Sequence, residues 1–521
     1  MKEFNVTGTC IPSMHYMVDT SQKLDQIIEL IDRGRYFTIN RARQYGKTTT
    51  FAALSRRLKT RYLVIRMSFE GMGEMAFRSD EAFVRNFVRK VARELEFHRQ
   101  PESLLAAWQE FESYSEKDFE DAFDFLSQKI TRLCRNSGQE IVLMIDEVDK
   151  SSDNQIFLNF LGMLRNKYLD QNEERDITFK SVILAGVYDI KNLKLKLHPD
   201  AERKYNSPWN IAADFTVDMS FSAEEIATML REYEDDCHTG MDIEKISEEL
   251  HFYTGGYPYL VSRLCKWIDE EGAREWTAEN VRAAEKELLH TPCTLFDDVA
   301  KNYENNPGLR EVIDNMLFDG KRYDYVMTDP VIGLGVMLGI FCRKAESVAI
   351  SNIIFETLLY NHVMIRKDRE GLVHVPERGQ FVKCGRLDMV RVLEKFQELM
   401  HAEYRQADEG FVERQGRLLF LCFLKPIING TGFYYVEPET RNSTRMDIVV
   451  AYGGEEFIIE LKLWRGSKYR ADGIRQLEAY MDSRRQEKGY LVSFSFLKKE
   501  QSACGWITQK ESAKRIFEVI I

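Results

Sequence analysis

The stretch YFTINRARQYGKTTTFAALSRRL, residues 36–58, reads as a short apolar strand followed by a turn and a helix. A phosphate-binding loop needs this order, because backbone N–H groups of the turn and of the helix N-terminus then face the phosphates. In such a loop Lys47 would contact the β- and γ-phosphates of a nucleotide, and the hydroxyl of Thr48 would bind magnesium. Arg41 stands where the usual pattern has its first glycine. The expected nucleotide-binding residues of this stretch are Arg41, Gln44, Tyr45, Gly46, Lys47, Thr48 and Thr49.

A second apolar strand, IVLMIDE at residues 141–147, ends in a pair of carboxylates. Asp146 would hold magnesium, and Glu147 would activate the water that attacks the nucleotide. Each motif has a plain alternative, since GKT follows some strands by chance and a carboxylate pair suits a helix N-cap. Both motifs in this order, each on an expected strand, favour a site for ATP and Mg²⁺.

The first 290 residues alternate between strand-like and helical stretches. Three of the strand-like runs are apolar on both faces, which is typical of buried strands in a parallel sheet. These runs are residues 62–69, 141–146 and 181–186. We therefore expect an α/β multidomain protein with a P-loop core over residues 1–220. A helical lid is expected over residues 221–290, because Ser222 and Glu225 form the signature of a capping box at its start.

Residues 291–384 are expected to form a winged-helix-like linker of helices, one of them over residues 329–341, with a short strand at Val348–Ile350. Modules of this kind either bind DNA or pack against their own ATPase. No basic recognition helix stands out in this part of the sequence, which favours the packing role.

The run MDIVVAYGGEEFIIELK, residues 446–462, reads as a hairpin that turns at its Gly-Gly pair. A turn centred there places Asp447 directly opposite Glu460, with Cβ atoms about 4.5–5.5 Å apart. Lys462 shares that face because side chains alternate along a strand. Two carboxylates can hold Mg²⁺ and a lysine can stabilise charge, which is the chemistry of a metal-dependent phosphodiesterase. The alternative is a cross-strand salt bridge on a solvated face.

Residues 1–290 resemble AAA-type ATPases of the signalling (STAND-like) branch. The resemblance includes YTGGYPYLVSRLC, residues 253–265, which looks like the GGxP turn of that branch's lid. The segments NRARQYGKTTT, SPWNIA and TGGYP together resemble a bacterial group of AAA-ATPase-like proteins that are usually fused to a C-terminal nuclease-like domain. That group has an arginine at the position of Arg41. A polar sensor would be Tyr188 or Asp189, and no arginine finger can be assigned.

Residues 385–521 resemble the PD-(D/E)XK nuclease superfamily, whose signature is matched by Asp447, Glu460 and Lys462. Met446 replaces the proline of the motif. The resemblance implies a restriction-endonuclease-like α/β domain in which the two carboxylates bind Mg²⁺ and the lysine assists catalysis. It also implies a glutamate before the hairpin and a glutamine after it. The candidates for these positions are Glu413, or alternatively Glu437, and Gln476. Gln476 lies on a helix that is expected from about Asp472 to Arg484.

The composition is that of a soluble globular protein, with 44% hydrophobic and 30% charged residues. No apolar run reaches the roughly 20 residues of a membrane helix. The N-terminus has no apolar signal-peptide core, and the nine scattered cysteines lack zinc-site spacing, so we expect reduced thiols, a cytoplasmic location and no membrane partner.

The net charge is −11, yet residues 441–521 carry 15 Lys and Arg against 11 Asp and Glu. Basic and aromatic residues near the hairpin would follow a nucleic-acid backbone or form a solvated loop. These residues are Trp464, Arg465, Lys468, Tyr469 and Arg470.

The two motif sets on one chain predict an ATP-binding and ATP-hydrolysing protein coupled to a Mg²⁺-dependent nuclease domain. Nucleic acid is the expected partner, with DNA favoured over RNA, and a homo-oligomer is possible. The alternative is a nucleotide-switched signalling or scaffold ATPase whose nuclease-like domain binds without cutting.

Overall fold

The structure is a computed structural model of the 521-residue chain. It divides into two compact units, Met1–Thr291 with Gly333–Phe341, and Pro292–Ile332 with Cys342–Ile521. The residues that it describes are 2–109, 121–148, 155–187, 209–318, 321–369, 380–383, 385–403, 413–428, 432–435, 448–463, 467–484, 486–495, 504–508 and 514–521.

The centre of the first unit is a parallel sheet of four strands in the order β1-β4-β3-β2. An isolated parallel bridge between Phe37 and Ala213 continues the sheet beyond β1. Every residue of β3 and β4 is buried, as the apolar composition of both runs predicts for strands covered on both faces. The strands are β1 (Phe37–Asn40), β2 (Leu63–Ser68), β3 (Ile141–Asp146) and β4 (Ser181–Gly186).

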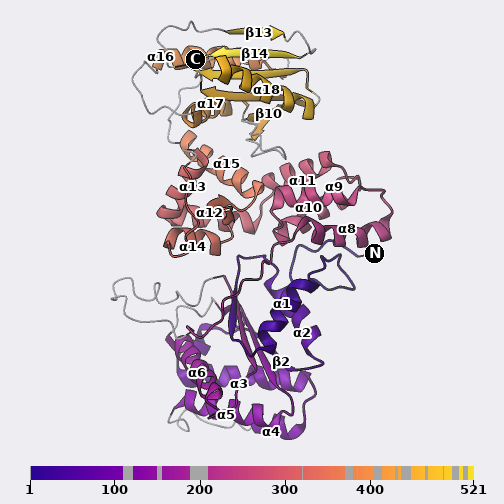
Figure 1. The fold of residues 1–521 in the computed structure, drawn as a ribbon, viewed down its shortest axis with the longest axis vertical. Helices are drawn as coiled ribbons and strands as arrows, with labels where there is room; N and C mark the ends of the chain where they lie inside the picture. The colour runs from indigo at the N-terminus through magenta and orange to yellow at the C-terminus, as the bar shows by residue number, and fades with distance from the viewer. Residues whose placement is uncertain are drawn as a thin grey trace. The chain divides into compact units, whose positions relative to one another are not determined.

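Helices cover both faces of this sheet (Figure 1). Val142 and Met144 of β3 pack in one cluster with α1 (Ser21–Asp32) and α2 (Lys47–Leu58). Alternate residues of the same strand point to the other face, where the remaining elements pack. These elements are the 3₁₀ turn η1 (Glu74–Phe77) and helices α3 (Asp80–Phe97), α4 (Glu102–Gln109), α5 (Ala122–Asn136) and α6 (Gln155–Asn172).

The lid is a set of helices that follows the core. Its first helix begins at the expected capping box, in which Ser222 and Glu225 bond each other's backbone, so that prediction is confirmed. Pro258 is the first residue of the third lid helix, where its fixed φ and missing N–H cost nothing. The lid helices are α8 (Ala223–Cys237), α9 (Ile243–Thr254), α10 (Pro258–Glu270) and α11 (Ala278–His290).

The segment after the lid is helical with one small hairpin. The strand predicted at Val348–Ile350 is present as part of β6 (Ser347–Ile350), and it pairs with β5 (Phe341–Lys344). The sequence had suggested helix up to Phe341, but Gly339 takes a φ of 71° and the helix ends before it. The helices are α12 (Thr294–Asn305), α13 (Pro307–Phe318), α14 (Pro330–Met337) and α15 (Ile353–Arg369). The winged-helix assignment stays a prediction.

The C-terminal part is an α/β domain built on a sheet of six strands in the order β13-β14-β12-β11-β10-β9 (Figure 1). β11, β12 and β14 run parallel, and the outer pairs are antiparallel. A short β7–β8 pair, Val382–Lys383 with Arg386–Leu387, precedes it. The sheet strands are β9 (Gly432–Tyr435), β10 (Ile448–Tyr452), β11 (Glu455–Leu463), β12 (Lys488–Phe494), β13 (Cys504–Thr508) and β14 (Arg515–Ile520).

Both faces of this sheet are covered. One face packs against α18 (Ser467–Ser483), which begins earlier than the expected Asp472. On the other face α17 (Glu413–Ile428) lies so close that a Cβ on Gly416 would stand 2.3 Å from the Phe494 ring. α16 (Met389–Glu403) packs beside α17.

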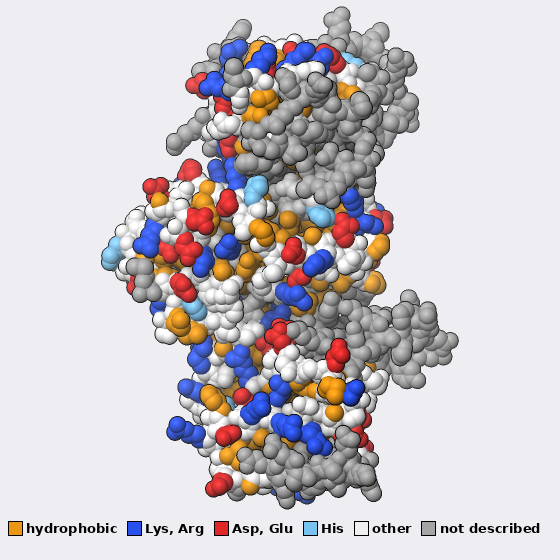
Figure 2. All heavy atoms as spheres, turned by 180° about the vertical axis from the view of Figure 1, so that it is seen from behind, with side chains coloured by type: hydrophobic (Ala, Val, Ile, Leu, Met, Phe, Trp, Pro, Cys, Tyr) orange, Lys and Arg blue, Asp and Glu red, His pale blue; other side chains and the backbone are white. Residues whose placement is uncertain are grey.

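No helix among the described residues is both long and apolar enough to cross a membrane. On the face drawn in Figure 2, acidic and basic side chains are intermingled over the described surface.

Candidate functional site

The turn between β1 and α2 has the shape of a phosphate-binding loop. Gly46 takes a left-handed φ of 77°, and Gln44 takes one of 57°. α2 begins at Lys47, so the N–H groups of its first turn point into the loop. The Lys47 ammonium is buried and donates to the carbonyl oxygens of Arg41 at 2.8 Å and of Ala42 at 2.9 Å. Its charge therefore lies inside the turn, where phosphate oxygens would approach.

The edge of the site at which the sequence predicts Mg²⁺ joins this loop to the end of β3. The Thr48 hydroxyl donates to Asp146 Oδ2 at 2.8 Å. The backbone N–H of Glu147 donates to Asp146 Oδ1 at 3.0 Å, and Glu147 itself takes a φ of 56°. All three line a cavity of about 470 Å³, together with Arg66 and Glu94. The structure thus brings together three predicted site residues from segments that are far apart in the sequence.

Arg66 and Glu94 give this cavity a second pair of charges. Burial raises the pKa of Glu94. Its Oε2 accepts a hydrogen bond of 3.3 Å from the backbone N–H of Arg66, which lies on the edge strand β2. Burial also lowers the pKa of Arg66, whose guanidinium donates to the Thr48 carbonyl oxygen at 3.3 Å. The sequence analysis did not find either residue.

The Arg41 side chain points to the segment that leads into the lid. Its guanidinium donates to the carbonyl oxygens of Val217 at 2.8 Å and of Asn40 at 2.9 Å, and it lies 5.5 Å from the centre of the Phe215 ring. The arginine that replaces the first glycine of the motif therefore ties the loop to the start of the lid. Its predicted contact with a nucleotide stays a prediction.

A second cavity, of about 420 Å³, lies beside the loop on the lid side. The predicted residues Gln44, Tyr45, Gly46 and Thr49 line it. Its other walls come from the N-terminal segment, from α1, and from the lid. Most of the lining is apolar, which suits a nucleobase and ribose next to a phosphate loop.

The TGGYP turn of the lid lies directly on the phosphate loop. The Tyr257 hydroxyl donates to the Arg43 carbonyl oxygen. The Tyr257 and Tyr45 rings meet edge to face, with their centres 4.6 Å apart. Gly256 packs so closely on the segment before α8 that an added Cβ would stand 1.9 Å from the Phe221 carbonyl oxygen. The missing side chain of Gly256 thus lets the turn pack directly on the segment before α8, while Tyr257 contacts the loop.

The hairpin at the predicted second site has the predicted register. Partners run from Ile448 with Ile459 to Tyr452 with Glu455, around a two-residue turn. Its two glycines have φ values of 57° and 82°, as a type I′ turn requires. That part of the prediction is confirmed. Asp447 itself lies outside the described residues.

Glu460 and Lys462 lie on the sheet face covered by α18. Glu460 pairs in register with Leu491, which belongs to the cluster under that helix. The Glu460 carboxylate is 1% exposed, and the Lys462 ammonium lies 2.9 Å from its Oε1. The Lys462 stem packs at Gly473, where an added Cβ would stand 3.2 Å from Lys462 Cγ.

The remaining predicted residues of this domain are placed less completely. Gln476 lies on α18, and its Oε1 is buried with no hydrogen-bond partner within the described part of the chain. Glu413 is the first residue of α17, but its side chain is not described. Arg470 binds Glu518 through two hydrogen bonds of 2.7 and 2.6 Å. Glu437, Trp464, Arg465, Tyr188 and Asp189 lie outside the described residues, as do the side chains of Lys468 and Tyr469.

Comparison with known proteins identifies the first part of the chain. Residues 8–279 match the family described as AAA-like domain. The chain belongs to this AAA-like family. The match spans the phosphate loop, the carboxylates after β3 and the TGGYP turn, so the AAA-type and P-loop ATPase parts of the resemblance are confirmed. The assignment to the signalling branch stays a prediction.

Solved structures similar to the AAA-like chain are distant, and no curated protein matches it. The Walker-type ATPase PABY2304 of Pyrococcus abyssi is 12% identical, with 68% of this chain and 99% of that chain covered at a TM-score of 0.47. The ORC1 protein of Aeropyrum pernix, solved in complex with DNA, is 12% identical, with 67% and 94% covered and a TM-score of 0.32. The ORC2 protein of the same organism, in ADPNP–ADP complexes, is 14% identical, with 66% and 92% covered and a TM-score of 0.33.

The AAA-like domain has a wall of its lid-side cavity that the sequence analysis missed. Residues 5–8, Cys10 and the α1 residue Lys23 line part of this cavity. The backbone N–H of Cys10 donates to the Thr49 hydroxyl at 3.2 Å, which fixes the N-terminal segment to the start of α2. No motif marks this segment, and its role follows only from long-range packing.

Proposed function

We propose that this AAA-like protein binds ATP with Mg²⁺ and hydrolyses it, and that its nucleotide state controls a C-terminal Mg²⁺-dependent phosphodiesterase that cuts nucleic acid. One observation carries the first half. The Thr48 hydroxyl and the Asp146 carboxylate lie 2.8 Å apart beside the buried Lys47 ammonium. A hydroxyl and a carboxylate are the oxygen ligands that Mg²⁺ prefers, so these residues fit the ion.

Each residue of the nucleotide site has a role in this proposal. Lys47 would bind the β- and γ-phosphates, and Thr48 with Asp146 would hold the ion. Bound Mg²⁺ neutralises charge that develops on the phosphates during transfer. Glu147 would orient the attacking water, since its backbone lies directly beyond Asp146 at the cavity. The cavity of about 420 Å³ would take the base and ribose.

Support for the second half comes from the carboxylate of Glu460. A carboxylate that is 1% exposed is costly to bury unless a cation or a metal ion compensates it. It shares a sheet face with Lys462, and the sequence-based alignment of the hairpin would pair it with Asp447. Asp447 and Glu460 would hold Mg²⁺, Lys462 would stabilise charge on the phosphate, and Gln476 or Glu413 would assist.

A second function is favoured by the same ion pair. At 2.9 Å, the Lys462 ammonium can compensate Glu460 without a metal ion. The C-terminal domain would then be a structural or binding module, and the protein a nucleotide-switched scaffold.

Cleavage of linear DNA, circular DNA and single-stranded RNA tests the proposal. The purified full chain is incubated with Mg²⁺ or Mn²⁺, with and without ATP, beside Asp447→Ala and Lys47→Ala variants. Cutting that is lost in Asp447→Ala supports the nuclease, and cutting that changes with ATP only when Lys47 is present supports the coupling. If ATP binds but neither DNA nor single-stranded RNA is cut, the scaffold function replaces the nuclease.

A further inference from the structure

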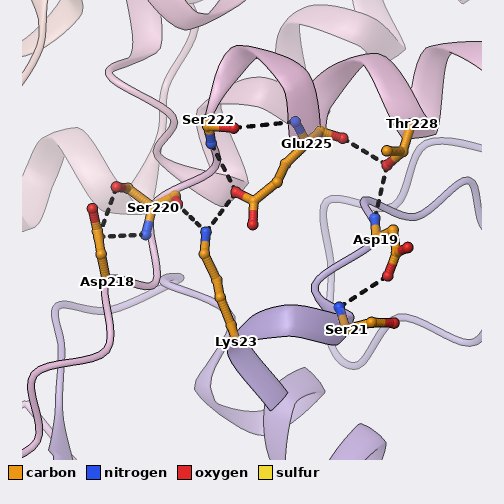
Figure 3. Close-up of polar contacts among 8 residues, drawn as sticks. All are labelled: Asp19, Ser21, Lys23, Asp218, Ser220, Ser222, Glu225 and Thr228. Carbon is orange, nitrogen blue, oxygen red and sulfur yellow. Dashed lines mark hydrogen bonds and ion pairs between the residues drawn. The ribbon is translucent and has the colours of Figure 1, made fainter. Parts of the chain in front are cut away.

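A lysine in the wall of the lid-side cavity also holds the lid. Lys23 of α1 lines the cavity of about 420 Å³. Its ammonium donates to Glu225 Oε2 on α8 at 2.5 Å and to the Ser220 carbonyl oxygen at 2.5 Å (Figure 3). The two charged side chains are only 18% and 21% exposed. A pair this well shielded from water is stronger than a pair on the surface.

The ion pair is continuous with the start of α8. The same Oε2 of Glu225 accepts the backbone N–H of Ser222 at 2.8 Å, and the Ser222 hydroxyl accepts the backbone N–H of Glu225 at 3.2 Å (Figure 3). One carboxylate oxygen therefore serves the capping box and the contact with the core. Movement of α8 away from α1 would break the ion pair and turn the Lys23 ammonium toward a mostly apolar cavity.

Further contacts bind the N-terminal part of the chain to α8 along its length. The Asp19 backbone N–H donates to the Thr228 hydroxyl at 2.8 Å (Figure 3). The Tyr16 hydroxyl donates to Asp236 at 3.0 Å, and Lys2 pairs with Glu232. These contacts, together with the Lys23–Glu225 pair at the first turn of α8, join the N-terminal part of the chain to the lid from one end of the helix to the other.

We propose that Lys23 is a positioning residue for nucleotide binding, and that its pair with Glu225 holds the lid in the arrangement that binds the nucleotide. This inference rests on the nucleotide binding proposed above. A nucleotide that fills the cavity contacts α1 on one side and the lid on the other, where Phe221 and Met229 lie. It therefore binds the closed arrangement better than an open one, and by linkage whatever favours the closed arrangement raises affinity.

The test uses variants that separate the pair from the helix cap. Glu225→Gln keeps an amide oxygen that can cap Ser222 but removes the charge, and Lys23→Met removes the ammonium while keeping the stem. We expect each to weaken ATP binding about 5- to 20-fold in titration calorimetry, a coupling of ordinary size. Because both remove one interaction, the double variant should bind about as well as either single variant. Lys23→Arg should recover part of the affinity.

Two controls make the result decisive. Asp235→Asn removes a charge from an exposed position of the same helix and should leave affinity unchanged. Hydrogen exchange of α8 should be slowed by ATP in the wild type and much less in Lys23→Met. If both single variants bind ATP as tightly as the wild type, and ATP still slows hydrogen exchange of α8 in Lys23→Met, the proposed role of Lys23 is overturned while the nucleotide site stands. If neither the wild type nor Lys47→Ala binds nucleotide in the titration, the proposed nucleotide site itself is overturned.

Discussion

The hydroxyl of Thr48 donates to Asp146 Oδ2 at 2.8 Å, which joins the first turn of α2 to the last residue of β3. The two residues are 98 positions apart in the sequence. Their contact places a hydroxyl and a carboxylate at one edge of the sheet, with the Lys47 ammonium buried in the adjacent loop. The carboxyl ends of parallel strands are where ligands of this class of sheet bind.

Asp146→Asn tests the magnesium role with little disturbance of the fold. The amide oxygen can still accept the Glu147 N–H, and the amide NH2 group can donate to the Thr48 hydroxyl, which rotates to accept it, so the thermal stability of the nucleotide-free protein should change little. Loss of the charge should lower ATP turnover at least about 100-fold, because the metal stabilises transition-state charge by several kcal/mol. The rise in nucleotide affinity on adding Mg²⁺ should also disappear. Wild-type turnover in this variant would contradict the assignment of Asp146.

Gly256→Ala tests the contact between the TGGYP turn and the hinge of the lid. Gly256 has a φ of 70°, and an added Cβ would stand 1.9 Å from the Phe221 carbonyl oxygen, a backbone atom. We expect a loss of about 2–4 kcal/mol in unfolding free energy from the strain and the clash together. Gly240 is the matched control, with a φ of 74° and no atom within 4 Å of an added Cβ. Gly240→Ala should cost only about 1 kcal/mol; equal losses in urea unfolding would show that the contact matters little.

The sequence predicted those parts whose signal is local. β3 was recognised because an unbroken apolar run, Ile141–Ile145, precedes Asp146, and the hairpin at β10 and β11 because two adjacent glycines separate two strand-like runs. Helix ends were placed less well. α18 begins at Ser467 instead of near Asp472, and a strand at β5 replaced the expected end of a helix. Termination by Gly339 is a backbone effect that apolar periodicity does not show.

The contacts that shape the nucleotide site could not be predicted from spacing. Lys23 and Glu225 are 202 positions apart, and although Glu225 was predicted as part of a capping box, nothing in the sequence paired it with Lys23. Arg41 was expected from the family resemblance, but nothing in the sequence showed that its guanidinium bonds the Val217 carbonyl oxygen. Such pairs depend on where the chain returns after long intervals. A single sequence specifies them only through the complete fold.

Metal binding at the second site is tested by Glu460→Gln. If the domain binds Mg²⁺ or Mn²⁺, the ion should raise the melting temperature of the wild type, and Glu460→Gln should abolish that rise together with DNA cleavage. Glu518→Gln is the control, because this glutamate is also buried in the same sheet and pairs with Arg470. It should destabilise the domain but keep the metal-dependent shift. A shift that survives in Glu460→Gln would place the ion elsewhere.

A buried lysine pair in the AAA-like core predicts a pH-dependent contribution to stability. Lys167 is 2% exposed and lies 2.5 Å from Asp176. Burial alone would raise the pKa of Asp176, but hydrogen bonds from Lys167, Thr131 and the Ile177 backbone outweigh it and lower the pKa. Asp176→Asn should therefore cost about 2–3 kcal/mol at neutral pH, because it leaves a buried ammonium without its carboxylate.

The sign of the pH effect follows from the direction of that shift. A carboxylate whose pKa is lowered by folding stabilises the protein above its unfolded pKa of about 4, and this stabilisation is lost as pH falls through the folded pKa. The difference in unfolding free energy between wild type and Asp176→Asn should thus stay constant from pH 7 to about 5 and shrink below about pH 4. Glu140→Gln provides the comparison, since Glu140 is 59% exposed in its pair with Lys180 and should cost less than about 1 kcal/mol. A difference for Asp176→Asn that is independent of pH down to the acid transition would show that the lost stability comes from packing rather than from the charge.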